Sequence, residues 1–204
     1  MKEAVLIAAG YVLGSLPWGY WLPLAVKRVD IRTLGSGNVG ATNVWRSFGW
    51  KLGLPVLLLD IAKGAGAALL GRLLDDELTG VLAGTAALAG HWRPIFLGFA
   101  RGGKVVATTG GVALAIAPLA GLSASALWIL VFLVTRYASV ASLVAGVSLP
   151  LFAVLYGASW PVLGFTIAAA VAIVILHRAN IGRLARHEEP RANLPLGRRA
   201  PASP

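Results

Sequence analysis

GSGNVGATNVWR, at residues 35–46, is the longest polar, glycine-rich run in a chain that is otherwise mostly apolar. Gly35, Gly37 and Gly40 satisfy the G-x-G-x-x-G pattern of dinucleotide-binding loops, and Asp60 stands about twenty residues further on, where such a loop needs a ribose-binding acid. The run has three interpretations: a Rossmann loop, a plain linker, or a phosphate-binding loop in another fold. The segments on either side of it decide the fold.

Composition places those segments in a membrane. Of the 204 residues, 57% are hydrophobic and 13% are charged, whereas soluble domains carry about 25% charged residues. We therefore expect an all-α integral membrane protein whose helices each contain roughly 20 mainly apolar residues. About seven segments fit this description: residues 4–26, 52–74, 78–97, 105–119, 120–135, 140–158 and 160–176.

Basic residues predict the orientation, because Lys and Arg accumulate on the cytoplasmic side of membrane proteins. They gather here in the connections at residues 27–51, 101–104 and 136 and in the tail after residue 177, whereas the connection at 75–77 is acidic. With seven helices, every basic connection falls on one side, which predicts an outside N-terminus and a cytoplasmic C-terminus. Six helices would break this alternation. We expect residues 1–189 to form a single transmembrane domain and the basic residues 190–204 to be a disordered tail.

Charge and cysteine content narrow the classes of function. The formal net charge of +10 indicates anionic lipid or phosphate-bearing ligands. With so apolar a chain, we expect no nucleic-acid partner. The absence of cysteine excludes a disulfide framework, a thiolate zinc site and a cysteine nucleophile.

The membrane topology excludes the Rossmann interpretation of residues 35–46. A Rossmann loop follows a buried strand inside a βαβ unit, whereas this run follows an apolar helix and a basic connection, and Asp60 lies inside the next apolar segment. A glycine-rich loop can still direct backbone N–H groups at a phosphate. Asn38, Thr42 and Asn43 would add donors, and Arg46 a bidentate clamp. A solvated loop with a juxtamembrane arginine remains the alternative.

Two further polar clusters fall on the same predicted side. Gly102, Gly103 and Lys104 precede a predicted helix, where an anion is favoured, and Thr108 follows them. His177 and Asn180 share a helical face at the exit of the last predicted helix, and Ser142 can join them. Two anion-binding loops suggest two phosphorylated substrates or one bisphosphate.

Other polar residues have a structural interpretation beside the functional one. His91, at the end of the third predicted helix, is expected to be a structural hydrogen-bonding residue rather than a catalyst. Asp60 and Lys63 lie three residues apart within one apolar segment. They can form a structural ion pair, or mark a functional site as intramembrane charges often do.

At these residues the chain resembles the bacterial membrane acyl-phosphate:glycerol-3-phosphate acyltransferases, whose motifs read GSGNxGATNxxR, GHxxPxFxxFKGGKGVAT and HRxNIxRL. This chain has GSGNVGATNVWR at 35–46, GHWRPIFLGFARGGKVVAT at 90–108 and HRANIGRL at 177–184. It departs from the family at Val105, where glycine is usual, and by an extra alanine before Arg101. The resemblance implies catalytic roles for Ser36, Arg46, Lys104 and His177. It implies substrate-binding roles for Gly37, Asn38, Gly40, Thr42, Asn43, Gly102, Gly103, Thr108, Ser142 and Asn180.

The same resemblance implies an activity: transfer of an acyl chain from acyl phosphate to the sn-1 hydroxyl of glycerol 3-phosphate, giving lysophosphatidic acid. It implies direct attack without a metal, a cofactor or a covalent acyl-enzyme, with His177 or the substrate's own phosphate as the base. Expected partners are the two substrates, membrane lipid and an enzyme that makes acyl phosphate. The expected location is the bacterial inner membrane, with a cytoplasmic active site. An organic-anion transporter and a purely structural membrane protein are the competing hypotheses.

Overall fold

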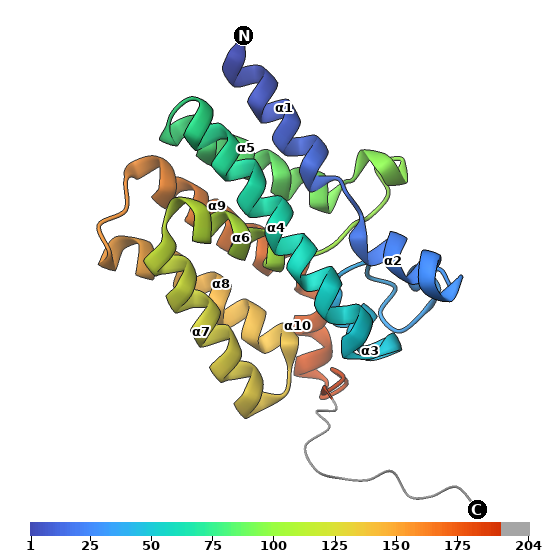
Figure 1. Cartoon of the computed structure of the whole chain (residues 1–204). Coiled ribbons are helices and arrows are strands. Elements are labelled where there is room, and N and C mark those ends of the chain that lie inside the picture. The colour runs from blue at the N-terminus through green and yellow to red at the C-terminus, as the bar shows by residue number, and fades with distance from the viewer. Residues whose placement is uncertain (193–204) are drawn as a thin grey trace, which may run out of the picture.

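The structure is a computed structural model that describes residues 1–192. Over these residues it is all-helical, as the composition predicts (Figure 1). The α-helices are α1 (Lys2–Gly14), α2 (Trp18–Lys27), α3 (Ala41–Phe48), α4 (Trp50–Leu74), α5 (Glu77–Trp92), α6 (Val106–Ile116), α7 (Pro118–Thr135), α8 (Ala138–Leu155), α9 (Trp160–Leu176) and α10 (Arg178–Ala185). Two short 3-10 helices are η1 (Ile31–Thr33) and η2 (Ile95–Leu97).

Helix α4 lies at the centre of the bundle and packs against α1, α3, α5 and α6 (Figure 1). Helices α7 and α8 form a hairpin on the other side of α6, and α9 packs against α8. Close approach of α4 and α6 depends on glycine. A Cβ on Gly64 would strike the carbonyl of Thr108, and one on Gly111 would strike the carbonyl of Ile61. This contact holds α6 beside α4, and with it the loop that carries Lys104.

The first predicted segment is broken, because Pro17 disfavours the helical conformation of the residue before it. Helix α1 ends at Gly14 and α2 begins at Trp18. The break leaves the carbonyl of Leu16 without a helical partner, and Nζ of Lys63 donates to it over 2.8 Å. A buried lysine of α4 thus stabilises the kink in the N-terminal segment.

Helix length bears on the number of membrane spans. Within residues 1–192, four segments are long and apolar enough to cross a membrane: Lys2–Lys27, α4, α7 and α8. Helix α9 together with α10, bent by 54°, makes a fifth. The third and fourth predicted segments appear as α5 and α6, with 16 and 11 residues, which are shorter than the roughly 20 residues of a typical span. The predicted count of seven and the predicted orientation stay predictions.

The outer surface suits a bilayer. Large apolar side chains are exposed along α4, α7 and α8, among them Leu73 at 76%, Val134 at 75% and Leu151 at 68%. An apolar exterior with polar groups turned inward is the arrangement expected in lipid. Of the predicted disordered tail, residues 193–204 lie outside the described part of the chain. Residues 190–192 run beside the α7–α8 turn, where the Ala192 N–H donates to the Arg136 carbonyl over 2.8 Å.

Candidate active site

One cavity of about 320 Å³ lies between α4, α6, α7, α8 and α9. Its wall is polar at one end and apolar at the other. Ten of the predicted site residues line it: Ser36, Asn38, Gly40, Thr42, Asn43, Arg46, Lys104, Ser142, His177 and Asn180. Gly37, Gly102, Gly103 and Thr108 lie outside the lining. Three motifs that are far apart in the sequence therefore meet at a single cavity.

The first motif is shaped by Asn43, which is buried with 3% of its surface exposed. Its Nδ2 donates to the carbonyls of Leu34 over 3.0 Å and Asn38 over 2.9 Å. Its Oδ1 accepts the N–H of Ser36 over 3.1 Å. Gly35 has φ +56°, and a Cβ there would strike Oδ1 of Asn43. The Asn43 amide was expected to donate to a phosphate, but its Nδ2 hydrogens donate to carbonyls of the loop itself.

The sequence predicted a loop as far as Arg46, but the chain becomes helical at Ala41. The Gly40 N–H donates to Oδ1 of Asn38 over 2.7 Å, which turns the chain into α3. The backbone N–H groups of Ala41 and Thr42 have no acceptor within residues 1–192, and both residues line the cavity. Thr42 and Arg46, four residues apart, share a helical face. The motif thus offers an anion a helix N-terminus with an arginine one turn away.

The second motif folds back on the end of α5. The Gly102 N–H donates to the carbonyl of Trp92 over 2.8 Å, and the Gly103 N–H donates to that of His91 over 3.0 Å. A Cβ on Gly103 would strike Nε2 of the His91 ring. These glycines therefore let the loop pack against His91, and their N–H groups are already paired. Lys104, the next residue, is the one that reaches the cavity.

Val105 adopts a left-handed backbone with φ +58°, the conformation that suits the glycine usual in the family. A non-glycine residue there costs about 1–2 kcal/mol. Its side chain is only 2% exposed and lies in the main apolar core, where burying a valine contributes about 1.5–3 kcal/mol. Burial of the side chain therefore offsets the backbone strain of a valine at this position.

The third motif joins Lys104 to the end of the described chain. Nζ of Lys104 donates to Oδ1 of Asn180 over 2.5 Å, and Nδ2 of Asn180 donates to Glu189 over 2.7 Å. Nε of Arg183 donates to the other Glu189 oxygen over 2.7 Å. Burial lowers the pKa of Lys104 from 10.5 to about 8; nearby arginines also lower this pKa, whereas Glu189 raises it. Lys104 is therefore still charged at neutral pH.

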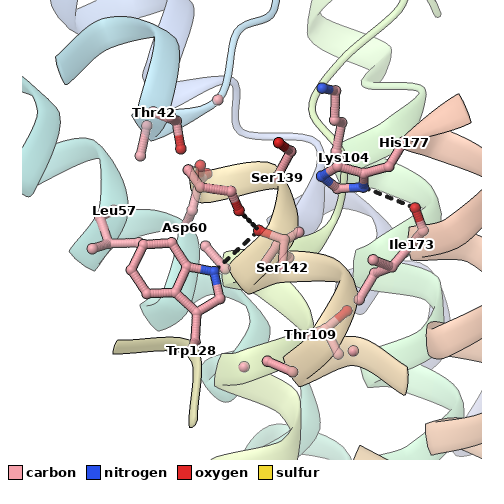
Figure 2. A pocket seen from close by; sticks show the side chains of 18 of the residues that line it. Thr42, Leu57, Asp60, Lys104, Thr109, Trp128, Ser139, Ser142, Ile173 and His177 are labelled. Atoms are coloured by element: carbon pink, nitrogen blue, oxygen red, sulfur yellow. Dashed lines mark hydrogen bonds between the residues drawn. The ribbon is translucent and has the colours of Figure 1, made fainter. Parts of the chain in front are cut away.

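His177 and Ser142 complete the polar end (Figure 2). Nδ1 of His177 lies 2.8 Å from the carbonyl of Ile173, so Nδ1 carries the proton, and in the neutral ring Nε2 is the acceptor. The Ser142 hydroxyl donates to the carbonyl of Ala138 over 2.7 Å and accepts from Nε1 of Trp128 over 3.0 Å. Both side chains are thus held in fixed orientations at the cavity wall.

Below the first two motifs lies a buried charged cluster. Nζ of Lys63 is 2.9 Å from Oδ1 of Asp60, so these residues form the ion pair that their spacing suggested. Nδ1 of His91 is 3.6 Å from the same oxygen. Asp60 and His91 also line the cavity. The cluster connects α4 to the N-terminal kink and to the end of α5.

Sequence reasoning missed Glu189, which it treated only as the end of the domain. A signal was present, since Glu188 and Glu189 are the only acids after Glu77 in a strongly basic half of the chain. It also missed Arg183, Thr109, Ser139 and Trp128, which line the cavity as well. Burial raises the pKa of the Glu189 carboxyl, the hydrogen bonds from Asn180 and Arg183 lower it, and the net effect is a lowered pKa.

The fold and site define a helical membrane protein with a cavity suited to an anionic, partly apolar ligand. The family model described as glycerol-3-phosphate acyltransferase matches residues 4–187. The enzyme of that name from Desulforudis audaxviator is 46% identical over 92% of this chain and 94% of its own length, and that of Geobacter sulfurreducens is 43% identical over 94% and 98%. The chain therefore belongs to the glycerol-3-phosphate acyltransferase family.

Two solved structures have the same fold. Both are crystal structures of PlsY, an integral membrane glycerol 3-phosphate acyltransferase. The glycerol 3-phosphate form has a TM-score of 0.90 at 39% identity, and the lysophosphatidic acid form 0.86 at 37%; each match covers 95% of this chain and 96% of the other. The protein is thus an integral membrane enzyme, which decides against the transporter and the purely structural hypotheses.

Proposed function

We propose that this enzyme transfers an acyl chain from acyl phosphate to the sn-1 hydroxyl of glycerol 3-phosphate, as the first acylation of phospholipid synthesis. The observation that carries the proposal is the two-part anion site. One part is the Ser36–Asn43 loop with the start of α3, whose first N–H groups have no acceptor within residues 1–192. The other part is formed by Arg46, Lys104 and Asn180, which come from α3, the loop before α6 and α10. Two phosphorylated substrates need two such groups. The lysophosphatidic acid form of the related PlsY structure agrees with this product.

In the proposed arrangement, the Ser36–Asn43 loop and the start of α3 hold the phosphate of the acyl donor. Arg46, Lys104 and Asn180 hold glycerol phosphate, with Ser142 and His177 beside them. Placing two anions next to each other is opposed by their repulsion, and the cations at this end of the cavity offset it. Alignment of two bound substrates can supply about 7–11 kcal/mol of the barrier.

In the proposed reaction, the sn-1 hydroxyl oxygen bonds to the acyl carbonyl carbon, and the bond from that carbon to the phosphate oxygen then breaks. Inorganic phosphate leaves, and the hydroxyl proton passes to a substrate phosphate or to Nε2 of His177. His177 suits the second route because Nδ1 already donates to Ile173. Gly37, Gly102, Gly103 and Thr108 would act by shaping the two loops rather than by touching substrate. No metal or cofactor is needed in this scheme.

The proposal places the site on the cytoplasmic side of a bacterial inner membrane, where the basic connections are expected. That side supplies glycerol 3-phosphate, and an enzyme that makes acyl phosphate would be a natural partner there.

A donor assay tests the proposal. Purified protein is given glycerol 3-phosphate with palmitoyl phosphate, palmitoyl-CoA or palmitoyl-acyl carrier protein, and lysophosphatidic acid is measured. We expect product from palmitoyl phosphate alone. Product from palmitoyl-CoA but not from palmitoyl phosphate would refute the donor assignment.

A further inference from the structure

The apolar end of the cavity has one wall built by α6. The α6 residues that line it are Val106, Ala107, Thr109, Gly110, Ala113 and Leu114. Most follow a spacing of three and four residues, which marks one face of a helix. In Figure 2, Thr109 and Trp128 are drawn in the lower half of the view, away from Lys104 at the top, and Ile173 lies just above Thr109. The α6 wall therefore extends from the charged end into the apolar part.

Gly110 differs from the other glycines near this cavity. A Cβ on Gly111 would strike α4, one on Gly121 would lie 2.7 Å from the Leu114 nitrogen, and one on Gly146 would lie 3.0 Å from Cδ1 of Ile173. Those glycines serve helix packing. A Cβ on Gly110 has no heavy atom within 4 Å, and its backbone is ordinary α-helix. Neither packing nor backbone conformation requires a glycine at this position.

We infer that Gly110 sets how bulky and how long an acyl chain the cavity accepts, an inference that rests on the proposed acyl transfer. The missing side chain leaves open space in the α6 wall. The occupant of this space is the acyl chain of the donor, because the apolar wall is continuous with the charged end that would hold the donor's phosphate. A ligand with an anionic head and a long apolar tail fits both ends at once.

The inference makes a graded prediction about substitutions. Gly110→Ala adds one methyl group in open space and favours the helix. Gly110→Leu fills the space that the acyl chain would use. We expect Gly110→Leu to lower kcat/KM for palmitoyl phosphate relative to decanoyl phosphate by about tenfold, the size of effect caused by overfilling a packed site. Gly110→Ala should show a smaller shift in the same direction.

Gly164 in α9 provides a matched control. A Cβ there also meets nothing within 4 Å, but Gly164 is exposed and outside the cavity lining. Gly164→Leu should keep the chain-length profile of the unaltered enzyme. The KM for glycerol 3-phosphate should stay within about twofold in all three variants, because the charged end is unchanged.

The experiment measures lysophosphatidic acid from decanoyl, dodecanoyl, myristoyl and palmitoyl phosphate with each variant. A profile in Gly110→Leu that matches the unaltered enzyme would overturn the inference. An equal loss of kcat/KM with every donor in Gly110→Leu, together with an unchanged chain-length profile in Gly110→Ala, would also overturn the inference. Failure of the unaltered enzyme to use any acyl phosphate would instead refute the proposed function.

Discussion

Nζ of Lys104 donates to Oδ1 of Asn180 over 2.5 Å, across 76 residues of sequence. The bond connects the loop before α6 to α10 and so joins the second and third motifs. Glu189 accepts from the Asn180 amide, which turns the amide oxygen toward the lysine. The charged end of the cavity is therefore a connected set of side chains in which each fixes the next.

Removing either principal cation should abolish most activity. We expect Lys104→Ala and Arg46→Ala each to lower kcat/KM by about 100-fold, since each loses charged hydrogen bonds worth roughly 1.5–3 kcal/mol to a phosphate. Lysophosphatidic acid formation measures the loss, and thermal unfolding checks the fold. Lys51→Ala is the control, because Lys51 is exposed and outside the cavity lining. Near-normal turnover in both cavity variants would refute the two-anion scheme.

The pKa of Lys104 predicts a pH dependence. Burial lowers this pKa to about 8, so the charged, anion-binding form is present below pH 8 and is lost above it. We expect kcat/KM to fall with a basic limb near pH 8. In Lys104→Arg the group stays protonated, and the limb should disappear from the accessible range. Persistence of the same limb in that variant would assign it to another group.

Glu189 should control the position of that limb. Its charge raises the pKa of Lys104, so Glu189→Gln should move the basic limb to lower pH. Glu188→Gln is the neighbouring control, because Glu188 is exposed and, within residues 1–192, pairs with Arg186. A purely structural role for Glu189 would reduce the amount of folded enzyme and leave the limb where it was.

Asn43 should matter to stability and Thr42 to binding. Asn43→Ala leaves the Ser36 N–H and the Asn38 carbonyl without partners and removes one of the two donors to the Leu34 carbonyl, so we expect a loss of about 3 kcal/mol in the free energy of unfolding. Thr42 is exposed at the cavity, and Thr42→Ala should change stability by less than about 0.5 kcal/mol. Thermal unfolding in detergent distinguishes the two. Equal stability of both variants would show that the Asn43 bonds do not hold the loop.

The buried pair Asp60 and Lys63 should be strongly coupled. Lys63→Met leaves a buried carboxylate without its cation and should cost about 3–5 kcal/mol. Adding Asp60→Asn removes that unpaired charge, so the double variant should recover much of the loss. Unfolding measurements on the two single variants and the double variant give the coupling energy. Additive losses would mean that the two side chains act independently.

The helices and the meeting of three motifs could be predicted from sequence, because apolar runs and clustered polar residues are local features. The hydrogen-bond partner of each polar group could not be predicted from the sequence. Asn43 has the same donors whether it binds substrate or its own loop, and only the tertiary position of Leu34 and Asn38 decides between them. Glu189 was missed for the same reason, since its partners lie on α10 and, through Asn180, on the loop before α6.

The lengths of the helices could not be predicted from the sequence either. The run from residue 4 to 26 contains no charged residue, yet Pro17 breaks it and Lys63 stabilises the break. The helix at residues 41–48 was not predicted, because glycine, asparagine and threonine are weak helix formers. The turn that leads into it is fixed by Asn38, whose Oδ1 accepts the Gly40 N–H.

The shortness of α6 has a consequence for how the protein is made. Eleven residues rise about 16 Å, roughly half the hydrocarbon thickness of a bilayer. A segment this short is poorly suited to crossing the bilayer by itself, and close packing on α4 at Gly64 and Gly111 helps to hold it in the bundle. We therefore expect larger residues at either glycine to lower the amount of folded protein in the membrane, a loss that can be measured before any enzyme assay.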